Sequence, residues 1–228
     1  MQPYFLPYLG YFQLIAAADL FIVYDNIKYT KKGWINRNRM LLNEEAATFS
    51  LPLKNASDSL DVNERELSPQ FSPEKLLNQL KAAYRKAPYF HETLPLLEKI
   101  LGCTENNLFD FLMHSISECC RHLGVTTPIR RSSDISIEHA LKSQEKVLAI
   151  CHATGACQYL NAIGGVELYD RNIFLEQGLE LQFIRPRLAP YPQLGGPFVP
   201  WLSIIDIMMF NSPEAAKTAV NQEYDIVS

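Results

Sequence analysis

The sequence predicts an α/β fold: a mostly parallel, open, Rossmann-like sheet with a helical insertion in the middle of the chain. Apolar runs rich in β-branched and aromatic residues alternate with helical patterns in the first and last thirds, which is typical of parallel strands joined by helices. Residues 72–124, in contrast, carry helical patterns alone. The 228 residues, 47% hydrophobic and 20% charged, fit one globular domain. We therefore expect a single α/β domain over 1–228, with 72–124 as a helical insertion or subdomain.

The first third predicts a loop, a helix and then strands. A Pro- and Tyr-rich loop leads into a short helix over 10–18, and the apolar run 20–24 is typical of a buried parallel strand. This order favours a further strand ahead of these elements, and the sequence leaves open whether that strand is missing. Residues 26–43 form a polar, basic connection. The strand over 48–53 is expected at a sheet edge, because Pro52 cannot donate to a ladder.

The insertion and the last third follow an irregular link over 54–71. The insertion is expected to hold helices over 72–85, 93–101 and 104–123. Ser72 and Thr104 are the expected caps of the first and third, and Gly124 ends the third. In the last third we expect strands over 128–131, 158–162 and 179–185, helices over 144–154, 167–175 and 203–210, and a loop over 186–200 with five prolines. Ser143 is the expected cap of the helix that starts at Gln144.

Composition excludes several classes of function. The formal net charge of −4 does not suggest a nucleic-acid-binding protein. No apolar run reaches the roughly 18–20 residues of a membrane span, and the first residues lack the basic region of a secretory signal. Five cysteines without a framework spacing indicate a reduced, cytoplasmic compartment. Cys119, Cys120 and His122 have no zinc-ligand spacing, so no metal site is expected, and the residues identify no cofactor.

The segment 2–12 is the first that could carry chemistry. Its prolines fix the backbone, and Gly10 permits a close approach where a helix begins. The unpaired N–H groups of a first helical turn can hold an anion. We therefore predict that Gln2, Tyr4 and Gly10 bind substrate, with Tyr11 as a candidate general acid or base. The alternative is an aromatic plug packed against the domain.

The segment 28–39 is the strongest pointer to an anionic ligand. It contains five of the 21 basic residues, and no acid lies between Asp25 and Glu44. The basic residues are Lys28, Lys31, Lys32, Arg37 and Arg39. We predict that Lys32, Arg37 and Arg39 bind phosphate, that Asn36 and Asn38 orient hydroxyls, and that Trp34 stacks on a ring. The alternative is a solvated basic loop.

Two further segments complete the candidate site. A strand that ends in polar residues and glycines before a helix is typical of ligand sites in open α/β sheets, although a simple tight turn is the alternative. The predicted binding residues there are Asn161, Gly164, Gly165 and Tyr169, with Glu167 as a candidate acid or base. Asp206 lies on an otherwise apolar helix after the Pro-rich loop. A buried carboxylate needs a partner, so Asp206 is either a catalytic or binding acid or a structural partner for an Arg or a backbone cap.

Four blocks of sequence together resemble the WbqC-like protein family. The blocks are QPYFLPYLGYFQLI, KKGWINRNR, YLNAIGG followed by Glu167 and Tyr169, and FVPWLSIIDIMMFNSP. They match in order and spacing over essentially the whole chain. The resemblance implies a bacterial protein of O-antigen and other surface-polysaccharide biosynthesis. It also implies modification of a nucleotide-linked or amino sugar by acyl or aminoacyl transfer, and a short strand before the QP motif.

A weaker likeness concerns the fold alone. Pro7-x-x-Gly10-Tyr11-x-x-x-Ile15 is similar to the HIGH-type segment of nucleotidyltransferase-like proteins, with Tyr11 at the position of the histidine and no KMSKS-like segment. Three hypotheses remain open. They are a transferase that acts on a nucleotide-linked or phosphorylated sugar, a non-catalytic module that binds a glycan precursor or a partner enzyme, and an ATP-using ligase that holds phosphate at Gly10. The expected ligand is a small anion, a nucleotide or sugar phosphate.

Overall fold

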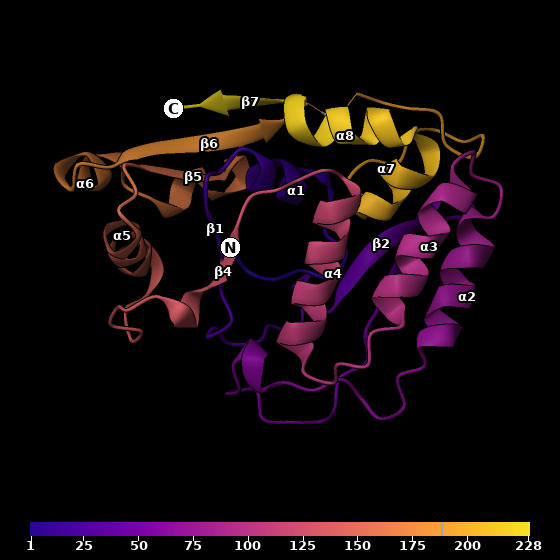
Figure 1. Ribbon diagram of the computed structural model, residues 1–228, viewed down its shortest axis with the longest axis horizontal. Coiled ribbons are helices and arrows are strands. Elements are labelled where there is room, and N and C mark those ends of the chain that lie inside the picture. Colours follow the sequence, from indigo (N-terminus) through magenta and orange to yellow (C-terminus); the bar gives the residue numbers. More distant parts are fainter. Residues whose placement is uncertain (188) are drawn as a thin grey trace.

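The computed structural model describes residues 1–187 and 189–228, which form a mixed α/β fold (Figure 1). The helices are α1 (Leu9–Ala16), α2 (Pro73–Tyr84), α3 (Phe90–Leu101), α4 (Leu108–His122), α5 (Ser143–Thr154), α6 (Arg171–Glu176), α7 (Ile204–Phe210) and α8 (Pro213–Gln222). Short 3-10 helices η1 (Val62–Glu64), η2 (Ser132–Asp134) and η3 (Ile163–Leu168) lie between them. Leu188, within the expected loop 186–200, lies outside the described residues.

The strands form three small sheets. β1 (Phe21–Val23) pairs in parallel with β4 (Ile129–Arg131), and β2 (Arg37–Leu42) pairs antiparallel with β3 (Glu45–Ser50). β5 (Gln158–Ala162) pairs in parallel with β6 (Glu180–Pro186), which also pairs antiparallel with β7 (Tyr224–Val227).

The α/β class and its parallel pairings are therefore confirmed, but the described residues form no continuous Rossmann-like sheet. One reason is that β1 and β4 are three residues long, too short to support a wide ladder. A second reason is that the partner of β6 opposite β5 runs antiparallel.

Several element boundaries differ from the prediction. Asn107, not Thr104, caps α4, because its side chain accepts from the Asp110 amide at 3.2 Å. Ser143 does not cap α5, since it lies within the helix at φ +47° and Lys142 holds the cap position. The expected helix over 167–175 is divided into η3 and α6.

Among the α-helices and strands of the described residues, three had no counterpart in the prediction, namely β2, α8 and β7. β2 lies inside the segment expected to be a basic connection. α8 begins at Ser212, whose hydroxyl accepts from the Ala215 amide at 3.1 Å, and Pro213 follows at the first helical position. The Ser-Pro pair is a helix-start signal that the sequence already carried.

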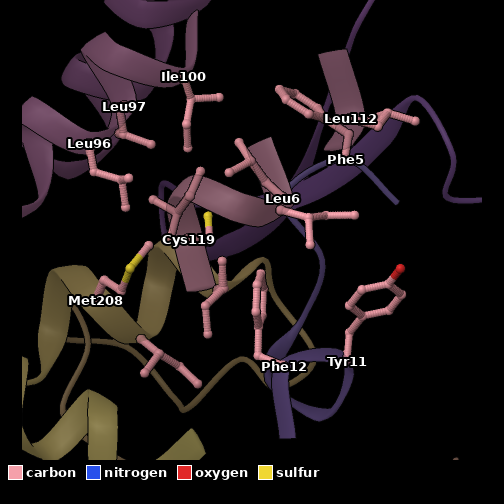
Figure 2. Packing of buried hydrophobic residues seen from close by; sticks show 14 of the residues in the cluster. Phe5, Leu6, Tyr11, Phe12, Leu96, Leu97, Ile100, Leu112, Cys119 and Met208 are labelled. Atoms are coloured by element: carbon pink, nitrogen blue, oxygen red, sulfur yellow. The ribbon is translucent and has the colours of Figure 1, made fainter. Parts of the chain in front are cut away.

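The helical insertion shares its core with the N-terminal segment. Figure 2 shows Phe5, Leu6 and Phe12 packed among side chains of α3, α4 and α7. The ring of Phe5 lies 6.0 Å from that of Phe111 in α4. This shared burial fixes the path of the chain before α1, because filling the core requires Phe5 and Leu6 to point inward.

Hydrogen bonds place the N-terminal segment beside two strands. The Met1 amino group donates to the Ile22 carbonyl at 2.7 Å, and the Tyr24 amide donates to the Met1 carbonyl at 2.8 Å. Further along, the Phe5 amide donates to the Ile35 carbonyl at 3.0 Å. Residues 2–8 therefore run between the carboxyl end of β1 and the approach to β2.

Candidate functional site

A cleft of about 310 Å³ opens where four distant segments of the chain meet. Its lining residues come from the N-terminal loop, from the segment that leads into and includes β2, from η3, and from the end of the Pro-rich loop. They are Tyr4, Tyr8, Trp34, Asn38, Arg39, Ile163, Gly164 and Trp201. Each of the four sequence blocks singled out above contributes at least one lining residue. The blocks therefore form one site, although up to 197 positions separate their lining residues.

Aromatic rings form much of the cleft wall. The chain has two tryptophans, and both line the cleft, with Trp34 40% and Trp201 51% exposed. The ring of Tyr8 meets that of Trp201 edge to face at 6.0 Å. Burial raises the pKa of Tyr4 and of Tyr8, so both hydroxyls stay protonated at neutral pH. Large exposed rings in a concave site suit stacking on a sugar or base.

Arg39 is the charged residue among the eight that line the cleft. Its Nη2 donates to the Trp201 carbonyl at 2.9 Å, and its guanidinium carbon lies 5.4 Å from the centre of the Trp34 ring. The Arg39 Nε is buried and has no hydrogen-bond partner among the described residues. A buried donor without an acceptor is costly. Because this Nε is shielded from solvent, a ligand in the cleft would contact the other N–H groups of the guanidinium.

The wall beside Arg39 is held by a buried amide. Asn38 donates through Nδ2 to the Phe5 carbonyl at 3.1 Å and to the Leu6 carbonyl at 2.8 Å. Its Oδ1 accepts from the Arg39 amide at 2.8 Å. Leu6 has φ +44° and Trp201 has φ +60°, which cost a non-glycine residue about 1–3 kcal/mol each. Backbone strain of this kind is concentrated at functional sites.

The other predicted residues of 28–39 do not line the cleft. Arg37 donates through Nε to the Gly33 carbonyl at 2.9 Å and through Nη2 to the Lys32 carbonyl at 2.5 Å. It therefore closes the loop onto itself. Asn36 accepts from the Tyr29 hydroxyl at 2.8 Å and donates to the Leu51 carbonyl at 2.8 Å. The Lys32 side chain is exposed.

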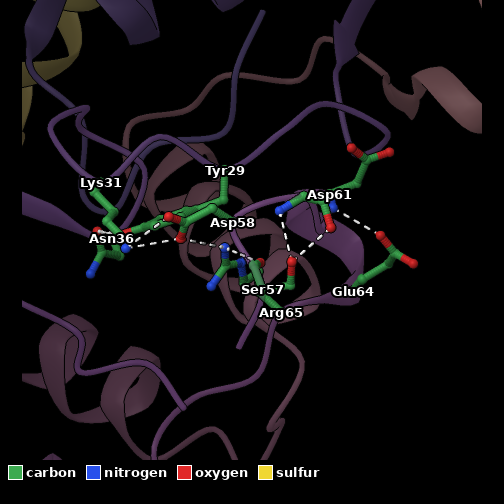
Figure 3. A network of polar contacts seen from close by, with 9 residues as sticks. Tyr29, Lys31, Asn36, Ser57, Asp58, Asp61, Glu64 and Arg65 are labelled. Carbon is green, nitrogen blue, oxygen red and sulfur yellow. Dashed lines mark hydrogen bonds and ion pairs between the residues drawn. The ribbon is translucent and has the colours of Figure 1, made fainter. Parts of the chain in front are cut away.

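A polar network behind this loop sets its shape (Figure 3). Lys31 pairs with Asp58 at 2.9 Å. Buried Arg65 lies 4.7 Å from the centre of the Tyr29 ring and donates to the Ser57 carbonyl at 2.7 Å. The acid that pairs with Lys31 thus lies more than twenty residues away in the sequence. Segment 28–39 therefore carries less unpaired positive charge than its local sequence indicated.

The N-terminal candidates divide between the cleft and the core. Tyr4 lines the cleft, and Gln2 lies behind it, with Oε1 3.5 Å from the Tyr4 hydroxyl. Tyr11 is 2% exposed, and its hydroxyl donates to the Gln2 carbonyl at 2.9 Å. A Cβ on Gly10 would lie 2.6 Å from the Tyr8 ring and 2.8 Å from the Pro186 ring. Gly10 is therefore required for close packing beneath the cleft.

The turn after β5 presents Gly164 to the cleft. Asn161 supports it, donating to the Tyr169 hydroxyl at 3.0 Å and accepting from the Ala162 amide at 2.7 Å. A Cβ on Gly165 would lie 3.0 Å from Nδ2 of Asn161, so a side chain there would press on that amide. Glu167 is exposed and is not among the lining residues.

The four segments of the cleft also lie within one family match. The model of the WbqC-like protein family matches residues 2–218. The chain belongs to this family. A protein of Mycobacterium tuberculosis described as "Uncharacterized protein Rv1507c" is similar, with 27% identity over 218 residues, which is 94% of each chain. No solved structure matches the chain.

In this WbqC-like chain, Asp206 lies fully buried on α7 and does not line the cleft. Its Oδ1 accepts from the Tyr84 hydroxyl at 3.1 Å. Its Oδ2 accepts from the Tyr191 hydroxyl and from Nε2 of Gln193, both at 2.7 Å. Burial raises the pKa of Asp206, although these hydrogen bonds oppose the shift. Among the described residues, the partners of Asp206 are two tyrosine hydroxyls and a glutamine amide, not the arginine or backbone cap considered from the sequence.

Sequence reasoning did not single out three lining residues of the WbqC-like cleft. Tyr8 and Trp201 lie inside segments that were recognised. Trp201 is one of the two tryptophans of the chain, and it follows directly after a loop rich in prolines and glycines. That combination could have identified Trp201, since exposed tryptophans on loops are frequent in binding sites. Ile163 carries no such signal.

Within 1–187 and 189–228, no group of three or more His, Cys, Asp and Glu side chains is placed to hold a metal ion. None of the helices in those ranges has the length and apolar character needed to cross a membrane.

Proposed function

We propose that the protein binds an anionic, nucleotide-linked sugar in this cleft and positions it for modification in surface-polysaccharide biosynthesis. The observation that carries the proposal is the meeting of two exposed indoles with Arg39, the charged residue of the cleft lining. A ligand with flat rings and a phosphate meets both requirements. The volume of about 310 Å³ lies within the range of small-molecule sites.

The lining residues divide the work of recognition. Trp34 and Trp201 offer faces for the base and the sugar, and a base stacked on an aromatic ring is worth about 1–3 kcal/mol. The guanidinium of Arg39 matches a phosphoryl oxygen pair in geometry and charge. Asn38 has all of its hydrogen-bonding groups engaged by the backbone, so we assign it to the cleft wall and not to ligand hydroxyls.

The chemistry available in the cleft favours positioning over proton transfer. The eight lining residues contain no carboxylate, imidazole or thiol, and the hydroxyls of Tyr4 and Tyr8 are the groups able to exchange a proton. Acyl or aminoacyl transfer to an amino sugar fits this composition, because an activated donor carries its own leaving group and the protein supplies orientation. The same composition favours non-catalytic capture of a glycan precursor as the second candidate.

The ATP-ligase alternative finds less support. It placed phosphate at the start of α1, and that position is occupied by packing, since Gly10 lies against the rings of Tyr8 and Pro186. Gly10 is itself buried. The first turn of α1 therefore offers little room for a triphosphate.

The test uses two arginines at similar distances from one indole. The guanidinium carbons of Arg39 and Arg37 lie 5.4 and 5.7 Å from the centre of the Trp34 ring, but only Arg39 lines the cleft. Calorimetric titration with UDP-N-acetylglucosamine, UDP and ATP should show binding of the nucleotide sugar. Arg39→Gln should weaken it about 10–100-fold, the loss of a charge-assisted hydrogen bond, whereas Arg37→Gln should change it little.

Three results would contradict the proposal. They are no binding of any nucleotide sugar, equal losses in the two variants, and preferential binding of ATP. Release of a modified sugar in the presence of acyl or aminoacyl donors would separate the transferase from the binding module.

A further inference from the structure

Residues 189–200, which we call the strap, directly precede Trp201, and contacts among their own side chains hold them together. Gln193 accepts through Oε1 from the Val199 amide at 2.8 Å and donates through Nε2 to the Val199 carbonyl at 3.3 Å. The ring of Tyr191 meets that of Phe198 edge to face at 5.0 Å. The two ends of the strap are thereby closed onto each other, and Val199 is fixed two residues before Trp201.

A second set of bonds fixes the chain just after Trp201. The Ser203 amide donates to the Arg39 carbonyl at 2.9 Å, and the Ser203 hydroxyl donates to the Leu6 carbonyl at 2.7 Å. Trp201 thus lies between two anchored positions, Val199 and Ser203, with its own carbonyl bound by Arg39. Its φ of +60° needs such restraint, because an unrestrained non-glycine residue leaves the left-handed region.

The strap is attached to the core at one carboxylate. α7 is otherwise apolar, and among the described residues Asp206 forms no ion pair. Its three donors are neutral, and two of them, Tyr191 and Gln193, belong to the strap. Removing the strap would leave a buried charge with Tyr84 alone, which is costly. The strap and the carboxylate therefore stabilise each other.

The third donor connects this anchor to the opposite cleft wall. The Tyr84 hydroxyl donates to Asp206 and accepts from the Leu41 amide at 3.0 Å. Leu41 lies in β2, two residues after Arg39. One carboxylate is thus connected through Gln193 to the segment that carries Trp201, and through Tyr84 to the strand that carries Arg39.

We propose that Asp206 is a positioning residue of the cleft: its buried carboxylate anchors the strap and so holds Trp201 as a fixed aromatic wall. The claim about Trp201 stands on the contacts above. Its consequence for ligand affinity rests on the proposed function.

Tryptophan fluorescence tests the structural claim without ligand. In a Trp34→Phe background, Trp201 is the remaining tryptophan, and its anisotropy decay reports how firmly the ring is held. Asp206→Asn and, independently, Tyr191→Phe should raise the amplitude of the fast component about twofold or more, because a released loop moves on the nanosecond scale. Tyr191→Phe removes the hydroxyl that donates to Asp206 and keeps the ring, so this variant keeps the test available if Asp206→Asn does not fold.

Thr93→Val is the matched control. Thr93 donates to the Met208 carbonyl of α7 at 2.9 Å, and among the described residues it forms no hydrogen bond with the strap. Its loss should therefore lower the melting temperature and leave the decay of Trp201 unchanged. With Trp34 present, the same two variants that loosen Trp201 should bind UDP-N-acetylglucosamine about tenfold more weakly than the native protein, as expected when a stacking ring is no longer held in place.

The outcomes separate the two proposals. An unchanged Trp201 decay in folded Asp206→Asn and Tyr191→Phe, or an equal change in Thr93→Val, would overturn the role of Asp206. A loosened Trp201 in a protein that binds no nucleotide sugar would support the anchor and overturn the proposed function. A loosened Trp201 with unaltered nucleotide-sugar affinity would also overturn the positioning role.

Discussion

Replacing Asn38 by leucine tests whether the cleft wall depends on one buried amide. Leucine has the branched skeleton of asparagine with slightly larger end groups and cannot form side-chain hydrogen bonds, so the variant deletes three contacts for a modest increase in volume. These contacts join the side chain to the Phe5 carbonyl, the Leu6 carbonyl and the Arg39 amide. Asn38 is 5% exposed, so water cannot readily replace them.

The magnitude follows from which groups are left without a partner. The Leu6 carbonyl still accepts from the Ser203 hydroxyl, so two backbone groups are orphaned, the Phe5 carbonyl and the Arg39 amide. Each costs about 1–3 kcal/mol, which predicts a loss of about 2–6 kcal/mol in the free energy of unfolding. That is a large part of the 5–15 kcal/mol typical of a domain.

Urea unfolding followed by circular dichroism measures this loss. Asn36→Leu is the control, because Asn36 is only part-buried and its partners are the Tyr29 hydroxyl and the Leu51 carbonyl. It should cost about 1 kcal/mol. Equal losses in the two variants, or a loss below about 1 kcal/mol for Asn38→Leu, would refute the assignment of Asn38 as the support of the wall.

Two further predictions concern Trp201 and Asp25. Trp201→Gly and Trp201→Ala should weaken nucleotide-sugar binding to the same extent. The free energy of unfolding in urea should be about 1 kcal/mol higher for the glycine variant than for the alanine variant, because glycine tolerates φ +60°. An alanine variant of equal or greater stability would contradict backbone strain at this position. Burial tends to raise the pKa of Asp25, but hydrogen bonds from Ser133 and Ser132 outweigh it and lower that pKa below 3.8. The resulting stability is present above the unfolded pKa and lost as pH falls through the folded pKa. Ser133→Ala should therefore destabilise at about pH 7, and its stability should converge toward that of the native protein as pH falls below the unfolded pKa of about 3.9. A stability difference that stays constant as the pH falls through this region would refute the role of Ser133.

Local signals predicted helices α2, α3 and α4 and most of the strands, but they did not predict how the strands divide among three separate sheets. Ser72 accepts from the Lys75 amide at 3.2 Å as its cap position predicted, because capping involves atoms a few residues apart. β2 was hidden because its inward-facing residues include Asn38, a polar side chain made acceptable inside by carbonyls more than thirty positions away. The division of the sheet depends on strand length and pairing direction, which no local pattern fixes.

The candidate site could likewise be predicted only in part. The segments that meet at the cleft were predicted, but residue type alone did not distinguish the residues that face the cleft from their neighbours that do not. Arg37 and Arg39 are two positions apart on β2, yet Arg37 turns back to carbonyls of its own loop and Arg39 lines the cleft. The two roles of Asp206 were equally compatible with sequence, because its donors lie at positions 84, 191 and 193.

The bond between the Ser203 hydroxyl and the Leu6 carbonyl spans 197 positions. Contacts of such separation form late, because a long stretch of chain must be ordered before they stabilise anything. The nascent chain on a ribosome therefore cannot assemble the cleft until synthesis has passed residue 203. A ligand that stabilises the native protein by binding in the cleft can therefore act only on chains whose synthesis has passed this residue.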